Sequence, residues 1–330
     1  MSTFTAIGVD VGGTKIAAGV VTFPDGVVQV RREIPTLYHS DLVRMRREIP
    51  TLPQRGGEAV LADVERLVSE LAAEARASGQ HVEAIGMGIC EIVDRSGNIA
   101  SANCLGWTSD NVRQRLSKIA PTVIEADVRA AALAEALLGA GRYLNVFLYV
   151  SIGTGISSCL VIDGQPFVGA GGATGTMASG PLPGFDEVRT MTTLPTLEQV
   201  ASGPALVSRF NQLHGNAQSG QEVLAAAAAG DERAARVVRS AAEALGGTIG
   251  LLVNVLDPAL VVLGGGLGAS VGIFRDSLID AARRRIWWEG HRDLPIVAAM
   301  TGPDAGVIGA AAKARDVSLV AGRPGGTTVD

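Results

Sequence analysis

The feature that most constrains the fold of this chain is a set of three glycine-rich turns. Each turn directly follows an apolar run typical of a buried strand. They read DVGGTK at 10–15, SIGTGIS at 151–157 and LGGGLG at 263–268. Glycine lets backbone N–H groups approach phosphate oxygens closely, and threonine adds a hydroxyl donor. One such turn would be read as a structural connection, whereas three indicate phosphate binding. Neither the P-loop pattern nor the dinucleotide-binding glycine pattern follows the first strand.

Both halves of the chain begin in the same way. A strand over 5–11, a glycine turn and a strand over 16–23 open the first half, and residues 145–169 repeat this order. Apolar periodicity predicts a helix over 57–79, and helices are expected to dominate 196–250. The segment RREIPTL occurs at 31–37 and again at 46–52, and we interpret this as a local duplication that forms a surface connection.

Composition narrows the possible partners. The 330 residues carry a net charge of −5 without a long run of like charges, which argues against nucleic-acid and membrane partners. The longest apolar runs, such as 250–256, are shorter than the roughly 20 residues of a membrane span. No leader pattern opens the chain, and the three cysteines show no zinc or disulfide spacing. The sequence therefore predicts a cytoplasmic protein.

Asp10 stands at the end of the first strand, just before the first glycine turn. A carboxylate in this place can hold Mg²⁺, directly or through a water molecule. The alternative role for Asp10 is to cap the turn with its own side chain.

The turns also carry a resemblance. GVDVGGTKIAAGVV and SIGTGISSCLVIDG resemble the two phosphate motifs of the actin-like ATPase superfamily, and NVLDPALVVLGGGLG resembles its adenosine-side motif. Together with EADVRAAALAE and LEQVASGPAL, their order is similar to that of the ROK family of bacterial sugar kinases. The family also includes repressors with a DNA-binding segment before the first motif, and only nine residues precede Asp10 here, so we expect a kinase.

The resemblance implies an α/β fold with two lobes, the actin-like ATPase (ribonuclease H-like) fold, with ATP and a sugar in the cleft between the lobes. We expect a small lobe over 1–125, a large lobe over 126–303, a closing helix over 304–317 that packs back on the small lobe, and a frayed tail over 318–330. ATP with Mg²⁺ and a homodimer are implied in the same way. The implied phosphate-binding residues are Gly12, Gly13, Thr14, Lys15, Gly153, Thr154 and Gly155, and those on the adenosine side are Gly264, Gly265 and Gly266.

Asp127 matches the general base of the family. An alcohol loses its proton as it attacks the γ-phosphorus, and a carboxylate in hydrogen-bonding reach accepts that proton. The family has asparagine where this chain has Ala126, and often a second asparagine where it has Arg129. Arg129 is expected either to reach a phosphate or to neutralise a neighbouring acid, and the alternative for Asp127 is a helix N-cap.

The sugar site keeps some family residues and loses others. Asn103 and Glu198 match sugar-contacting positions of the family, and Glu91 replaces a glycine expected to face the sugar. The alternative for Glu91 is a loop side chain that points outward. In the glycine-rich stretch GGATGTMASG at 171–180, Ala173 stands where the family has glutamate, and Thr176 stands where it has histidine.

These replacements bear on metal and substrate. Residues 185–196 contain no cysteine or histidine where the family has a zinc cluster, so zinc is not expected. We expect ATP-dependent phosphorylation of a primary hydroxyl of a modified hexose, a cyclitol or an aminosugar such as 3-amino-3-deoxyglucose (kanosamine), whose amine would pair with Glu91 and whose site would include Thr176. The alternatives are a zinc-less glucokinase or fructokinase, and a non-catalytic sugar-binding pseudokinase.

Overall fold

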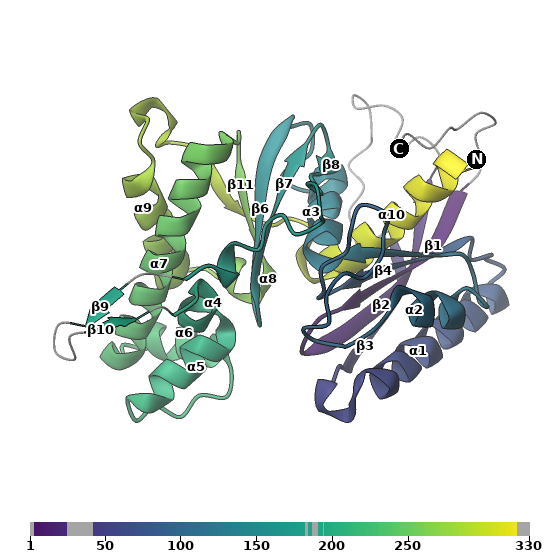
Figure 1. The fold of residues 1–330 in the computed structure, drawn as a ribbon, viewed down its shortest axis with the longest axis horizontal. Helices are drawn as coiled ribbons and strands as arrows, with labels where there is room; N and C mark the ends of the chain where they lie inside the picture. The colour runs from purple at the N-terminus through teal and green to yellow at the C-terminus, as the bar shows by residue number, and fades with distance from the viewer. Residues whose placement is uncertain (1–2, 25–41, 182–183, 187–190, 194, 322–330) are drawn as a thin grey trace. The chain divides into compact units, whose positions relative to one another are not determined.

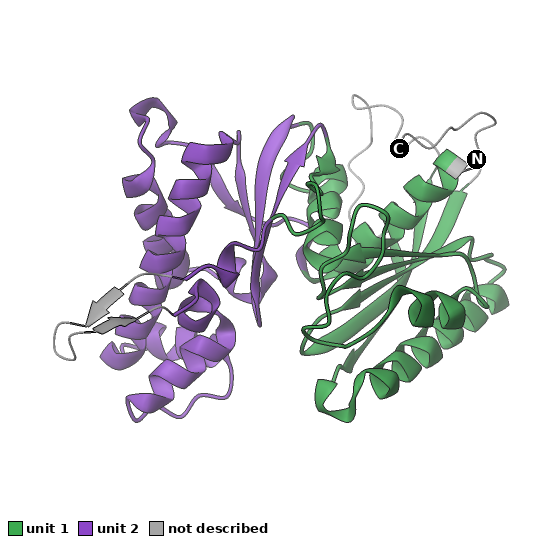
Figure 2. Cartoon of the chain, in the orientation of Figure 1, with its two compact units in different colours: residues 1–143, 164–174, 303–330 green, residues 144–163, 175–302 purple. Residues whose placement is uncertain are grey.

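The structure, a computed structural model, describes residues 3–24, 42–181, 184–186, 191–193 and 195–321. The chain divides into two compact units (Figure 2). Unit 1 comprises residues 1–143, 164–174 and 303–330, and unit 2 comprises residues 144–163 and 175–302. Each unit is built around its own mixed sheet with helices packed against it (Figure 1).

Unit 1 contains a five-stranded sheet in the order β3-β2-β1-β4-β5. Strands β1, β4 and β5 are parallel, whereas β2 pairs antiparallel with both β1 and β3. The carboxyl ends of the three parallel strands therefore meet at one edge, where the predicted polar residues of this unit follow. The strands are β1 (Thr3–Val11), β2 (Lys15–Pro24), β3 (Val43–Pro50), β4 (Ala84–Ile89) and β5 (Thr122–Ala126).

Helices cover both faces of this sheet because alternate residues of β1 point to opposite sides. Ile7 and Val9 pack with α1 (Gly57–Ala77) and α2 (Ser109–Leu116), and Ala6 packs with α3 (Asp127–Leu138) and α10 (Ala305–Ala321). The approach of α10 is very close, since a Cβ atom added at Gly8 would lie 1.9 Å from the Val307 carbonyl oxygen.

Unit 2 repeats the strand–turn–strand start. Strands β12 (Ile296–Ala298), β11 (Val261–Gly264), β6 (Val146–Ile152) and β7 (Ile156–Ile162) lie side by side in that order, with β6 and β7 antiparallel. Its core is formed largely by the sheet and by alanine- and leucine-rich faces of the helices. The helices are α4 (Leu197–Ala201), α5 (Gly203–Gln212), α6 (Gly220–Ala228), α7 (Glu232–Leu256), α8 (Gly265–Gly268) and α9 (Ile273–Arg285).

The observed units differ from the lobes expected from the sequence. The first division falls after Tyr143 rather than after residue 125, because α3 packs against α10 inside unit 1. Helix α10 continues to Ala321, beyond the expected end at residue 317, and the rest of the expected tail lies outside the described residues.

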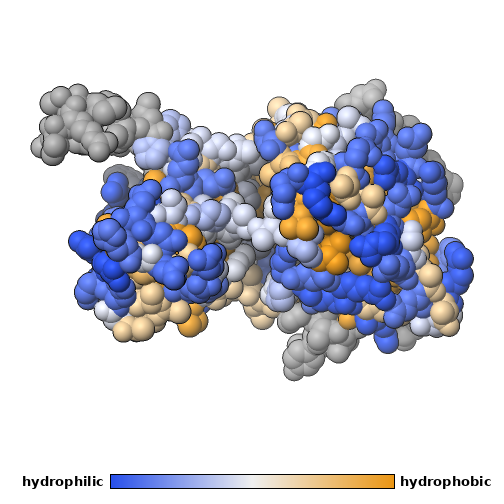
Figure 3. Space-filling view, turned by 90° about the horizontal axis from the view of Figure 1, so that it is seen from below, coloured by the Kyte–Doolittle hydropathy of each residue, from blue (hydrophilic) through white to orange (hydrophobic). Residues whose placement is uncertain are grey.

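The duplicated segment has one described copy. Residues 46–52 form most of β3 and the chain just after it, whereas the copy at 31–37 lies outside the described residues. Over the residues that the structure describes, no helix has the length and apolar character needed to cross a membrane. Hydrophilic residues cover most of the face seen in Figure 3, and hydrophobic residues gather in separate areas.

Candidate active site

Two carboxylates come together at the carboxyl edge of the sheet in unit 1. Asp10 lies near the end of β1, and Asp127 begins α3 directly after β5. Strand β4 lies between them, with Asp10 opposite Gly88 and Ile89 opposite Ala126. Both side chains belong to partly buried residues. The structure therefore brings together the predicted magnesium ligand and the predicted general base.

Burial makes both carboxylates weaker acids than usual. It raises the pKa of Asp10 to about 6, against the opposing effect of the Lys15 and Arg46 charges. Burial also raises the pKa of Asp127 to about 7, the negative charge of Asp10 adds to this, and the Val128 N–H and Arg129 oppose it. A carboxylate with a pKa near neutrality can both accept and release a proton at physiological pH. Asp127 therefore has the acid–base character that a general base needs.

Asp10 is suited to a cation. Its ionised form is disfavoured by burial, and a divalent cation bound to a carboxylate oxygen would relieve that cost. The first turn of α10 leaves room for the carboxylate only because residue 306 is glycine: a Cβ atom there would lie 2.4 Å from the Asp10 Cγ atom. The residues present thus fit Mg²⁺.

The first glycine turn is fastened by the second RREIPTL copy. The Gly12 N–H donates to the Lys15 carbonyl oxygen at 3.0 Å, and the Thr51 hydroxyl donates to the Gly12 carbonyl oxygen at 2.7 Å. Lys15 forms a 3.0 Å ion pair with Glu48, which also accepts a hydrogen bond from Arg46. The sequence reasoning missed this support, although the duplication had marked the segment.

Glu91 has a different role from the predicted one. Its carboxylate accepts hydrogen bonds from the Ser101 hydroxyl at 2.5 Å and from three backbone N–H groups, those of Asn103, Cys104 and Leu105, at 2.7–2.9 Å. A carboxylate has about four lone-pair sites, so these donors occupy all of them. The side chain belongs to a residue that is only 6% exposed, and the hydrogen bonds hold its pKa below the usual value despite burial.

Two corrections follow for the sugar side of unit 1. The expectation that Glu91 pairs with a substrate amine is wrong, because its oxygens are already saturated, and the alternative of an outward-pointing loop side chain is equally wrong. Glu91 instead orders residues 101–105. Asn103, the predicted sugar contact in this loop, is exposed, and its own N–H is one of the anchored donors.

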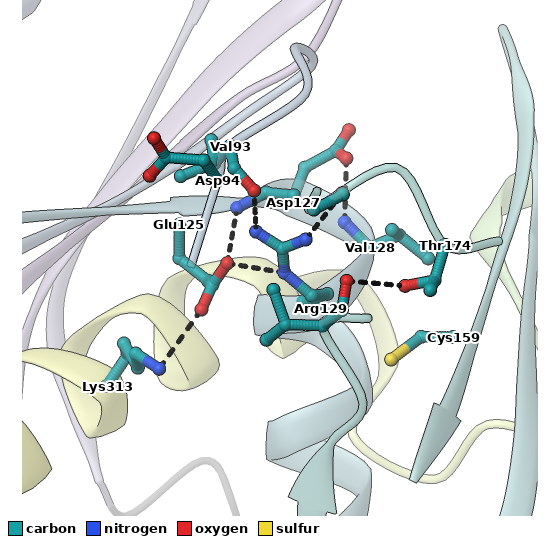
Figure 4. Close-up of polar contacts among 12 residues, drawn as sticks. Val93, Asp94, Glu125, Asp127, Val128, Arg129, Cys159, Thr174 and Lys313 are labelled. Atoms are coloured by element: carbon teal, nitrogen blue, oxygen red, sulfur yellow. Dashed lines mark hydrogen bonds and ion pairs between the residues drawn. The ribbon is translucent and has the colours of Figure 1, made fainter. Parts of the chain in front are cut away.

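Asp127 and Arg129 lie on the same turn of α3 but point to different partners (Figure 4). The N-cap of α3 is Ala126, and Asp127 Oδ1 accepts the Val128 N–H at 2.6 Å. Arg129, only 2% exposed, donates to Glu125, which also forms a 3.2 Å ion pair with Lys313. Of the two expected roles, Arg129 thus performs the second, which is to neutralise a neighbouring acid.

The second glycine turn lies in unit 2 between β6 and β7. The Gly153 N–H donates to the Gly155 carbonyl oxygen at 2.9 Å and closes the turn, while Thr154 is exposed at its tip. Glu198, at the start of α4, accepts the Ile156 N–H at 2.9 Å. This predicted sugar contact is therefore attached to the predicted phosphate turn.

The third glycine turn lies beside the second. A Cβ atom built at Gly153 would be 3.9 Å from the Gly266 nitrogen, and Gly265, with φ of +75°, packs against the backbone of Ile152. Gly264 packs against the Tyr149 ring. The structure thus brings the predicted residues Gly264, Gly265 and Gly266 next to the predicted phosphate turn 153–155.

Two residues at this place were not found from the sequence. The Gly203 N–H donates to the Gly153 carbonyl oxygen at 2.8 Å, and the Gln221 amide donates to the Gly266 carbonyl oxygen at 2.6 Å. Each lies in the first turn of a helix capped by serine, at Ser202 and Ser219. The Ser-Gly pairs at the starts of these helices were the available signal, because serine caps a helix and glycine permits close packing.

The glycine-rich stretch 171–180 passes from unit 1 to unit 2. Gly172 is buried with φ of +79°, and Ala173 after it is exposed. Thr176 is exposed in unit 2 and precedes a short 3₁₀ helix, Met177–Ser179. Residues 187–190 and 194 of the 185–196 region, on which the expectation of no zinc rests, lie outside the described residues, and that expectation stays a prediction.

Comparisons with known proteins agree with the motifs. The sequence model of the ROK family matches residues 6–317. A glucokinase from Streptomyces coelicolor is 27% identical, with 94% of this chain and 97% of the relative covered. An N-acetylmannosamine kinase from Escherichia coli is also 27% identical, with 96% of this chain and the whole relative covered.

Solved structures agree as well. A ROK-family glucokinase from Streptomyces griseus, in complex with glucose and AMPPNP, has a TM-score of 0.76 and 27% identity, with 94% of this chain and 99% of that one covered. A ROK hexokinase from Thermus thermophilus has a TM-score of 0.71 and 30% identity, with 96% and 99% covered. The expected two-lobed α/β class of fold is confirmed. The order of motifs, the two sheets and these matches together establish that the chain belongs to the ROK family.

Proposed function

We propose that this chain is an ATP-dependent carbohydrate kinase in which Asp127 removes a proton from a primary hydroxyl of the sugar. The class of enzyme is supported by full-length relatives named as glucokinase and N-acetylmannosamine kinase. The observation that carries the catalytic assignment is Asp127 itself, a partly buried carboxylate with a pKa near 7 beside Asp10.

Each group has a task in this mechanism. Asp127 accepts the hydroxyl proton as the alcohol oxygen attacks, which raises the nucleophilicity of that oxygen. The glycine turns offer backbone N–H groups to phosphate oxygens. Lys15, Thr14 and Thr154 add side-chain donors at the turns at 12–15 and 153–155. Mg²⁺, when bound with ATP at Asp10, supplies positive charge that offsets the negative charge of the phosphates.

The preferred substrate follows from the stretch 171–180. A site with Ala173 and Thr176 in place of glutamate and histidine has lost two strong hydrogen-bonding groups for sugar hydroxyls. A polar group left without a partner costs about 1–3 kcal/mol, enough to set selectivity. A modified hexose, an aminosugar or a cyclitol thus stays our proposed substrate, recognised with the help of Asn103 and Glu198. Any amine on it must be bound by a group other than Glu91, whose oxygens are filled.

A zinc-less glucokinase is the second candidate, and the relatives named glucokinase favour it. A panel of glucose, fructose, N-acetylmannosamine, 3-amino-3-deoxyglucose and cyclitols, assayed for ATP-dependent phosphorylation, separates the two. The highest kcat/KM for a modified sugar supports our proposal, and the highest value for glucose establishes the alternative.

The catalytic assignment has its own test. Asp127→Asn must abolish most phosphoryl transfer while the protein still binds sugar. Transfer within a few-fold of the unmodified protein would exclude Asp127 as the general base, and binding without transfer by the unmodified protein would indicate a pseudokinase. The expected homodimer and cytoplasmic location stay predictions.

A further inference from the structure

Arg129 connects segments that are far apart in the sequence. Its Nη1 atom donates to the Gly172 carbonyl oxygen at 2.9 Å, its Nη2 atom donates to the Val93 carbonyl oxygen at 2.6 Å, and its Nε atom donates to Glu125 Oε1 at 2.6 Å. The planar guanidinium is suited to such fixed, divergent bonds in a way that an ammonium group is not. Figure 4 shows the Arg129 guanidinium hydrogen-bonded to Val93 and Glu125, whereas the Asp127 carboxylate accepts the Val128 N–H.

The turn held by Arg129 has little freedom. Gly172 adopts a φ of +79°, and an added Cβ atom would lie 2.2 Å from the same Val93 carbonyl oxygen. The Thr174 hydroxyl donates to the Phe167 carbonyl oxygen at 2.8 Å and closes the segment on its other side. Ala173, which stands where the ROK resemblance places a sugar-binding glutamate, lies between these two fixed points.

The charge of Arg129 is matched within the network. Glu125 Oε1 accepts both the Arg129 Nε–H and the Ala126 N–H, and Glu125 Oε2 forms the 3.2 Å ion pair with Lys313 of α10. Glu125 and Ala126 end β5, directly before Asp127. The network therefore spans the start of the general-base helix, the turn at Val93 and the segment 172–174.

We propose that Arg129 is a positioning residue for phosphoryl transfer: it fixes the Gly172 turn and the Val93 turn to the start of α3, so that the sugar is held in register with Asp127. This inference rests on the proposed function. None of the residues expected to bind ATP is among the partners of Arg129. Its loss must therefore act on the sugar and on the rate of transfer, and leave ATP binding intact.

The variants are Arg129→Met, Arg129→Lys, Gly172→Ala and Gly171→Ala, assayed with glucose and with 3-amino-3-deoxyglucose. A displacement of about 1 Å in a reacting group costs about 100-fold in rate. For Arg129→Met we expect a fall in kcat of that order, a rise of about tenfold or more in sugar KM, and an ATP KM within about twofold of the unmodified protein. Arg129→Lys keeps the charge and must recover only part of the loss.

Gly172→Ala tests the same contact from the other side. Its methyl group must displace the turn from Val93 and raise sugar KM, whereas Gly171→Ala is the matched control, since its methyl group meets no atom within 4 Å. The double variant Arg129→Lys, Gly172→Ala must lose less kcat/KM than the product of the two single losses. The reason is that both substitutions disrupt the same contact, between Arg129 and the Gly172 turn. If Arg129→Met does not fold, Arg129→Lys, Gly172→Ala and the double variant still test the inference.

Three results would overturn the inference. The first is an unchanged sugar KM and kcat in Arg129→Met although the unfolding midpoint falls. The second is a rise in the ATP KM that parallels the rise in the sugar KM. The third is a loss of kcat/KM in the double variant that equals the product of the two single losses. Calorimetric titration of the sugar without ATP separates this inference from the proposed function. If the unmodified protein transfers no phosphoryl group but binds the sugar, a sugar Kd raised in Arg129→Met still supports positioning, and an unchanged Kd refutes it.

Discussion

Replacing Glu91 by glutamine tests whether its carboxylate serves the protein or the substrate. The carboxylate accepts four hydrogen bonds from residues 101–105. Glutamine keeps one acceptor oxygen and puts an NH₂ donor in place of the other. The Ser101 hydroxyl can rotate and accept from this donor. At least one backbone N–H, such as that of Asn103, then has no acceptor.

The expected loss of stability follows from the hydrogen bonds that Glu91→Gln removes. A hydrogen bond to a charged group contributes about 1.5–3 kcal/mol, and the part-buried Asn103 N–H that loses its acceptor adds a smaller cost. Glu91→Gln should therefore lower the free energy of unfolding by about 2–4 kcal/mol, measured by urea titration and by the thermal midpoint. Glu289→Gln is the control, because its side chain is 90% exposed, and a change there should stay within about 0.5 kcal/mol.

The pH dependence gives a second check of the same reasoning. The pKa of Glu91 is lowered from 4.5 in the folded protein, so its stabilisation is present above pH 4.5 and is lost as the pH falls through the lowered value. The stability difference between the unmodified protein and Glu91→Gln should thus be complete at pH 7 and shrink in acid. An unchanged unfolding midpoint, together with a loss of activity confined to amine-bearing substrates, would refute the structural role.

Three further outcomes are expected at the edge of the unit 1 sheet where Asp10 and Asp127 lie. Asp127→Asn should lower kcat by about 10²–10⁴-fold. It should also raise the unfolding midpoint at pH 8, because the raised pKa of Asp127 means that its ionised form destabilises the folded state. A lower midpoint at pH 8 would contradict this. With the unmodified enzyme, kcat/KM should fall as the pH drops through about 7, where the Asp127 carboxylate gains a proton; a profile that stays flat down to pH 5 would exclude this titration. Gly306→Ala places a methyl group against the Asp10 carboxylate and should raise the Mg²⁺ concentration needed for half-maximal activity, whereas Gly247→Ala, where an added methyl meets no atom within 4 Å, should leave it unchanged.

Much of the fold, including the positions of the glycine turns, was predictable from the sequence. The strand–turn–strand starts of both halves are local features, because alternating burial, glycine turns and short apolar runs are properties of neighbouring residues. The glycine turns at 12–15 and 153–155 were placed correctly between strands for the same reason. The order of the three glycine turns, taken together with the segments EADVRAAALAE and LEQVASGPAL, was sufficient to identify the family.

Tertiary structure decided what the polar side chains do. Glu91 reads from the sequence as a free acid in a loop, yet its charge is satisfied by backbone N–H groups more than ten residues later. Arg129 reads as a cation beside the predicted general base, yet it donates to the carbonyl oxygens of Val93 and Gly172. Sequence by itself determined the class of turns, strands and enzyme, since these depend on short patterns. Only folding determined which charges are already paired, because the partner of a buried charge is chosen by contacts between distant segments.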